Sequence, residues 1–209
     1  AKSLVRRALK TSCLVVVPLM TFLAVTADPL VKWLLGEKWV GAVLFFQMYC
    51  FIFALWPIHT TNLSALNGMG RSDLFLKLEI VKKIVGLAVL CVTVFSFHSP
   101  EAIVAGFMVT GIFSTIINAF PNRTVIEYGY WEQVVDIAPI WGLSLVSGAF
   151  GYALLGNMHL THWVTVFVIG LVFGSVFVTL GYVTRLEALR YVLTNGAKLV
   201  HTLYFRKAK

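Results

Sequence analysis

Long apolar stretches separated by short polar loops make up most of the chain. The hydrocarbon core of a bilayer is about 30 Å thick and needs about 20 residues of helix to cross it, so these stretches predict membrane-spanning helices. They are too continuous for the alternating strands of a membrane β-barrel. We therefore predict an all-α integral membrane protein, a six-helix transmembrane bundle. Its predicted spans are residues 9–27, 40–63, 74–97, 101–120, 137–155 and 163–183.

Residues 185–209 differ from the spans because they mix leucine and valine with basic side chains. The segment is too polar to cross the membrane, and Asn195-Gly196 is expected to divide it into two short helices. We predict an amphipathic basic tail on the cytoplasmic leaflet, held by apolar burial and by anionic membrane lipids. The predicted domains are then a six-span lobe over residues 1–184 and a tail over residues 185–209.

Composition and charge support a membrane location. Hydrophobic residues account for 59% of the chain and charged residues for 12%, whereas a soluble domain has about 45–50% and about 25%. The net charge of +8 gathers in alternate loops, which argues against nucleic acid as a partner. With six crossings these loops fall on one side, so both ends are predicted to be cytoplasmic. Because the chain begins with Ala1, we expect a piece of a longer protein or a processed one.

The third span begins with charged residues, and only residues 84–97 of it are free of charge. This charge-free part amounts to about 21 Å of helix, which is short of a hydrocarbon core of about 30 Å. Charged groups inside a bilayer usually face a bundle interior or a watery cavity. The charged residues in question are Arg71, Asp73, Lys77, Glu79, Lys82 and Lys83.

Helical spacing predicts how these charges pair. Asp73 and Lys77 are four residues apart, as are Glu79 and Lys83, and both pairs place the acid before the base. Such pairing leaves Arg71 and Lys82 without a partner. The charges either form a ring at the cytoplasmic interface that fixes topology, or they serve a ligand site.

In the ligand-site interpretation, Arg71, Lys77 and Lys82 hold an anionic headgroup at the mouth of a cavity, because lysine suits phosphate as a mobile point charge. The acid Glu79 is then a candidate for ion or proton coupling, although an ion pair with Lys83 is favoured.

Two prolines and a polar run give further candidates. Pro18 and Pro57 fall inside spans, where proline removes a helix hydrogen bond and bends the helix. Such a proline either allows the helix to move during gating, as in transporters, or is one of the prolines that membrane helices carry without a gating role. Asn62 belongs to the polar run that ends the second span, and it either contacts sugar hydroxyls or hydrogen-bonds neighbouring helices. Asp136, just before an apolar run, is a plausible helix cap.

Catalytic and metal-binding patterns are missing from the sequence. No Ser-His-Asp, Cys-His or paired-carboxylate set can be assembled, so we predict that the chain is not an enzyme and has no cofactor or metal. The three cysteines lie scattered in apolar stretches without paired spacing, which indicates buried reduced thiols.

A succession of short motifs resembles a known family. The motifs are Leu34-Leu35-Gly36-Glu37-Lys38-Trp39, Ala65-Leu66-Asn67-Gly68-Met69-Gly70-Arg71-Ser72-Asp73, Pro121-Asn122, Glu127-Tyr128-Gly129-Tyr130 and Asp136-Ile137-Ala138-Pro139. In this order they resemble the C-terminal half of bacterial oligosaccharide flippases, which export O-antigen or exopolysaccharide. Those flippases belong to the multidrug/oligosaccharidyl-lipid/polysaccharide exporter superfamily.

The resemblance implies one lobe of a two-lobed transporter in the bacterial inner membrane. Such proteins flip an undecaprenyl-pyrophosphate-linked oligosaccharide for lipopolysaccharide or exopolysaccharide biosynthesis, and Arg71 and Asp73 match the family's glycine-arginine-x-acid turn. The expected partners are membrane lipids, the lipid-linked oligosaccharide and a missing N-terminal lobe of the same chain. Without that lobe, six helices must dimerise or form a non-functional fragment.

Two alternatives to glycan flipping remain open at the level of sequence. One is an exporter of drugs or other lipid precursors on the same fold. The other is a membrane glycan polymerase or acyltransferase, which the short outer loops disfavour.

Overall fold

The computed structural model describes residues 1–156, 158 and 160–192, and all regular structure in these residues is helical. The helices are α1 (Lys2–Val25), α2 (Ala27–Leu34), the 3-10 helix η1 (Glu37–Ala42), α3 (Val43–Ala54), α4 (Trp56–Gly68), α5 (Ser72–Phe97), α6 (Pro100–Ala119), α7 (Asn122–Val125), α8 (Tyr130–Leu155) and α9 (His162–Val183). Residues 187–192 form a further short helical segment.

Six helical segments within these described residues are long and apolar enough to cross a membrane, and they follow the order of the predicted spans. One combines η1, α3 and α4 over Glu37–Gly68, and another combines α6 and α7 over Pro100–Val125. The predicted all-α membrane bundle is confirmed, and the chain is a multi-pass membrane protein. The part of the predicted tail over residues 193–209, including Asn195-Gly196, lies outside the described residues.

The observed helices begin earlier than the apolar pattern predicts at two places. The first starts at Lys2 and not near residue 9, and α8 starts at Tyr130 and not near residue 137. The added turns carry charged side chains that bind one another across α1 and α8, so their polarity does not end the helix. The same shift makes Asp136 an interior residue of α8, which corrects its predicted role as a cap.

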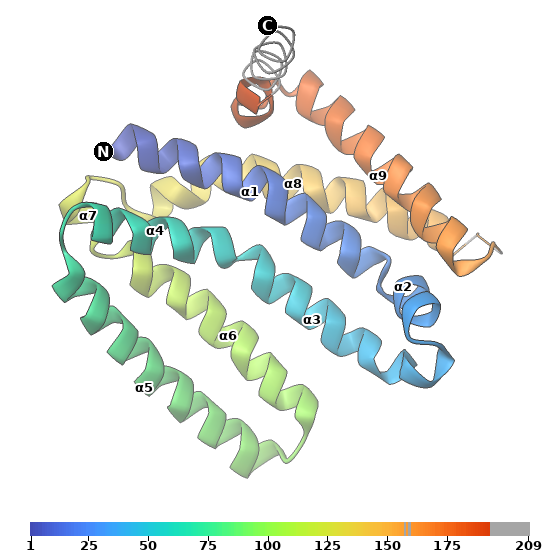
Figure 1. Cartoon of the computed structure of the whole chain (residues 1–209), viewed down its shortest axis with the longest axis horizontal. Coiled ribbons are helices and arrows are strands. Elements are labelled where there is room, and N and C mark those ends of the chain that lie inside the picture. Colours follow the sequence, from blue (N-terminus) through green and yellow to red (C-terminus); the bar gives the residue numbers. More distant parts are fainter. Residues whose placement is uncertain (157, 159, 193–209) are drawn as a thin grey trace, which may run out of the picture.

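The first helix lies at the centre of the arrangement, where it packs against α8, α3 and α4 (Figure 1). A hairpin of α5 and α6 packs on α3 and α4 on one side of the bundle, and α9 packs on α8 and α2 on the other. The start of α1, the α4–α5 turn and α7 lie at the left of Figure 1, and α2 lies at the right. We call the left end the basic end, because the start of α1, the α4–α5 turn and α7 carry Lys2, Arg6, Arg7, Arg71 and Arg123.

Proline affects the first two spans differently. The second span is divided, because α3 ends at Ala54 and α4 begins at Trp56 with Pro57 in its first turn. Proline fits there because its missing N–H is one that the first turn of a helix leaves unpaired. The first span continues without a break through Pro18 as far as Val25. A gating role for either proline stays a prediction.

Packing between α5 and α6 depends on close approach at one small residue. Thr93 is the one buried residue of α5. It faces Gly106 of α6, where an added Cβ atom would lie 2.9 Å from Thr93 Cγ2 and 3.0 Å from Val89 Cγ1. Small residues allow membrane helices to approach closely, since lipid provides no hydrophobic force between them. Gly106 therefore sets the distance between these two helices.

We predict that Gly106→Val destabilises the protein by about 1–3 kcal/mol, the usual cost of overpacking a close contact. The measurement is the unfolding midpoint of the detergent-purified protein. Gly142→Val is the matched control, because an added Cβ atom at Gly142 meets nothing within 4 Å. Equal losses in both variants would contradict a special role for Gly106.

Candidate functional site

A pocket of about 490 Å³ lies among α3, α4, α5 and α6. We call it the inner pocket. Its volume falls within the range of roughly 300–1,000 Å³ that is typical of small-molecule sites. Aromatic and polar side chains share its wall. They are Tyr49, Trp56, Phe107, His59, Thr60, Thr110, Ser114, Glu79 and Lys82.

An ion pair between Lys82 and Glu79 lies at the wall of the inner pocket. The Lys82 side chain is only 14% exposed. Its position in α5 is about 15 Å along the helix from Ser72, which places it well inside an apolar crossing segment. A charge at such depth normally faces protein or a water-filled cavity and marks a functional site. The opening of this pair onto a pocket fits that pattern.

The ion pairs of α5 differ from those that spacing predicts. Lys82 pairs with Glu79, three residues away, so the predicted pair of Glu79 with Lys83 is wrong. Lysines 82 and 83 project about 100° apart around the helix, and only Lys82 lines the inner pocket.

Arg71 binds the carboxylate that spacing assigns to Lys77. Its Nε atom lies 3.1 Å from Asp73 Oδ1, so the predicted pair of Asp73 with Lys77 is also wrong. Arg71 stands just before the helix, with a backbone outside helical geometry, and can fold back onto Asp73. The hydrogen bond raises the pKa of Arg71. Among the described residues no ion pair involves Lys77 or Lys83, and both are exposed. Exposure of these two lysines agrees with the predicted ring of charges at the membrane interface.

Asn62 does not line the inner pocket, although the sequence makes it a candidate for substrate binding. It is 1% exposed and forms a double hydrogen bond with Gln133 of α8. Its Oδ1 atom also accepts a hydrogen bond from Asn122 Nδ2 at 2.6 Å. The structure therefore assigns Asn62 to the other predicted role, hydrogen bonding between helices.

A second buried polar centre forms around Asp136, whose side chain is 4% exposed. Its Oδ1 atom lies 2.5 Å from Arg6 Nη2 and 3.2 Å from Lys10 Nζ, and its Oδ2 atom accepts a hydrogen bond from Tyr128 at 2.8 Å. Burial and the neighbouring Asp136 raise the pKa of Tyr128, so its hydroxyl stays a donor. Sequence reasoning missed this centre. The available signal was the four-residue spacing of Arg6 and Lys10 on one helix face.

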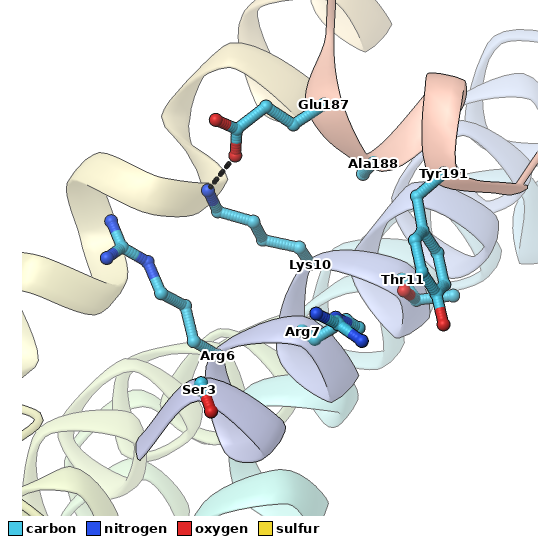
Figure 2. Close-up of a pocket in the computed structure, with 8 residues that line it drawn as sticks. All are labelled: Ser3, Arg6, Arg7, Lys10, Thr11, Glu187, Ala188 and Tyr191. Carbon is cyan, nitrogen blue, oxygen red and sulfur yellow. Dashed lines mark hydrogen bonds and ion pairs between the residues drawn. The ribbon is translucent and has the colours of Figure 1, made fainter.

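A third polar region is a pocket of about 430 Å³ between the first half of α1 and the helical segment 187–192, shown in Figure 2. We call it the basic pocket. Its lining comprises Ser3, Arg6, Arg7, Lys10, Thr11, Glu187, Ala188 and Tyr191.

Two contacts hold the short helix of the basic pocket against α1. Lys10 Nζ lies 2.9 Å from Glu187 Oε2, and this hydrogen bond lowers the pKa of Glu187. Arg7 stacks over the Tyr191 ring at 4.9 Å from Cζ to the ring centre. The start of the predicted tail thus packs on protein and not on lipid alone.

Comparison with known proteins finds a match over the first part of the chain. A family model described as a polysaccharide biosynthesis protein matches residues 1–44. No curated protein and no solved structure matches the chain significantly. The matched stretch covers α1, α2, η1 and the first residues of α3, and so includes the basic side chains around Asp136. The match connects the chain with polysaccharide synthesis or transport.

We predict that Asp136→Asn costs about 3 kcal/mol of stability, the lower end of the range for breaking a buried ion pair, because Arg6 is partly exposed. Glu132→Gln is the control, since Glu132 pairs with Lys2 and Arg6 at the surface and such pairs contribute under about 1 kcal/mol. Thermal unfolding of both purified variants tests this expectation. A loss in Glu132→Gln as large as in Asp136→Asn would contradict it.

We further predict that Asn62→Leu lowers stability by about 1–3 kcal/mol, because it leaves Gln133 Oε1 buried without its donor and removes the bonds from Gln133 Nε2 and Asn122 Nδ2 to the Asn62 side chain. Asn67→Leu is the same substitution at an exposed position of α4 and should change stability little. The readout is again the unfolding midpoint. If Asn62→Leu unfolds like the unmodified protein and only transport is lost, Asn62 has a substrate role and not a structural one.

Proposed function

We propose that the chain forms part of a transporter that moves a lipid-linked oligosaccharide across the bacterial inner membrane for surface polysaccharide biosynthesis. The observation that carries this proposal is the Lys82–Glu79 pair on the wall of a pocket inside the apolar part of the bundle. The proposed reaction is translocation alone, without covalent chemistry. The match to polysaccharide biosynthesis over residues 1–44 favours a glycan cargo over a drug.

The chemistry of the inner pocket suits a phosphate-bearing sugar. Lys82 supplies a mobile positive charge for a phosphate oxygen. Hydroxyl groups of Thr60, Thr110 and Ser114 offer both donors and acceptors to sugar hydroxyls. The aromatic wall gives apolar contact area, as in most ligand sites. One pocket thus combines groups that match each part of such a headgroup.

Glu79 gives the site a way to release its ligand. In the structure Glu79 neutralises Lys82, so the site carries little net charge when no anion is bound. An incoming phosphate competes with Glu79 for Lys82, and the displaced carboxylate is then available to a cation from solution. Return of Glu79 to Lys82 then favours release. This exchange is how we propose that Glu79 couples transport to an ion.

The arrangement of charge supports loading from one side. The basic end carries the start of α1 and the α4–α5 turn, and we propose that it faces the cytoplasm with both chain ends. The lipid-linked donor would be loaded there, beside Arg71. We also propose that a second lobe, from the same protein or from another copy, completes the translocation pathway.

The test is Lys82→Gln introduced into the gene that encodes the full-length protein. We expect surface polysaccharide to fall by about tenfold, since a charge-assisted hydrogen bond contributes about 1.5–3 kcal/mol. Lipid-linked repeat units should accumulate in the inner leaflet. Lys83→Gln is the matched control, with the same charge change one residue away on an exposed face. Normal surface polysaccharide in Lys82→Gln, or altered drug resistance alone, would overturn the proposal.

A further inference from the structure

We infer that the basic pocket binds the phosphate of an anionic glycerophospholipid whose acyl chain lies along α1. This site is separate from the inner pocket, and the inference does not depend on the transport proposal. It rests on three features of α1 and of the helical segment 187–192, which are the available charge, the order of side chains along one face, and the depth in the membrane.

The basic side chains of the basic pocket differ in whether they already bind a carboxylate. Arg6 and Lys10 bind the buried carboxylate of Asp136, and Lys10 also binds Glu187. Arg7 has no carboxylate partner in the part of the chain that the structure describes. Its Cζ atom lies over the Tyr191 ring, 4.9 Å from the ring centre, and a guanidinium in such a contact still has N–H donors that suit the oxygens of a phosphate. Arg7 is therefore the principal anion ligand.

Glu187 is the one acidic side chain in the lining, and it does not cancel this charge. Its side chain is 84% exposed, so solvent screens it, and its carboxylate is already bound to Lys10. Lys10 has three ammonium protons and uses two of them on Asp136 and Glu187. The third remains available to a phosphate oxygen beside Arg7.

The order of side chains along α1 points to a lipid and not to free phosphate. Arg7, Thr11 and Val15 are spaced by four residues and therefore lie on neighbouring parts of one helix face. Arg7 and Thr11 line the pocket, as Figure 2 shows, whereas Val15 is 60% exposed outside it. The polar pocket is thus followed along this helix face by an exposed apolar side chain. A phosphate carrying an acyl chain satisfies both parts at once.

The depth of the pocket agrees with a headgroup position. Arg7 lies in the second turn of α1, at the basic end of a helix long enough to cross the membrane. Basic pockets between helices at the cytoplasmic side are places where anionic lipid headgroups bind, and the negative surface of that leaflet adds attraction. The short helix 187–192 closes the pocket from the side opposite α1.

The experiment measures lipid binding to the detergent-purified full chain by native mass spectrometry and by thermal shift. The probes are dioleoylphosphatidylglycerol, dioleoylphosphatidylcholine and glycerol 3-phosphate. We expect phosphatidylglycerol to be retained and to raise the melting temperature, and the other two probes to do neither. Equal stabilisation by glycerol 3-phosphate would overturn the proposal that the ligand is a lipid, and would indicate a site for a free phosphate compound. Equal retention of phosphatidylcholine would overturn recognition of an anionic headgroup.

Two variants locate the site. Arg7→Gln should weaken phosphatidylglycerol binding by about tenfold, the loss expected for a charge-assisted hydrogen bond. The variant is expected to fold normally, because Arg7 is exposed and the Lys10–Glu187 pair still holds segment 187–192 against α1. Arg190→Gln removes the same charge from the neighbouring surface of segment 187–192 without touching the pocket lining, and it should bind as the unmodified protein does. Unchanged binding in Arg7→Gln, or an equal loss in Arg190→Gln, would overturn the site.

Discussion

The need of buried charged and amide side chains for partners inside a bilayer determines how this bundle is held together. Lipid provides neither hydrogen bonds nor counter-charge, so a charged or amide side chain within a span must find its partner in the protein. The Asp136 carboxylate collects Arg6, Lys10 and Tyr128 for this reason, and Asn62 collects Gln133 and Asn122. Each centre includes one side chain of α8, which is Asp136 in the first and Gln133 in the second. The two centres therefore connect α8 to α1 and to α4. Apolar packing then fills the space around these fixed points.

The hairpin of α5 and α6 depends less on such centres. Its contact with the rest of the bundle includes a hydrogen bond between Asn118 and His59, and its own two helices meet at Gly106 and Thr93. Most of the α5 surface is not covered by protein. The inner pocket lies between this hairpin and the pair of α3 and α4, which packs on α1, so its two walls belong to different parts of the bundle. A site that must change shape to pass a ligand suits such a boundary.

Hydrophobic pattern alone predicted the six crossing segments, because the length and continuity of an apolar run report directly on the bilayer. It failed at the starts of α1 and α8, where charged side chains continue a helix by binding one another. The Asp136 centre could not be predicted from the sequence pattern, because Asp136 and Arg6 are 130 residues apart in the chain. The pairs on α5 were predicted wrongly because helical spacing permits several partners for each charge, and in the structure Lys82 is the partner of Glu79. The sequence singled out Lys82, whereas the basic pocket needed the three-dimensional arrangement.

The separation of Arg6 and Lys10 from Asp136 also has a consequence for biogenesis. A ribosome delivers α1 to the membrane well before α8 is synthesised, so these cations at first lack their carboxylate. Positive charge at the start of a span biases the orientation of a membrane helix, and in that interval these two cations are free to do so. When the fifth span inserts, Asp136 captures the same two side chains. A topogenic determinant early in translation thereby becomes an interhelical clamp in the finished protein.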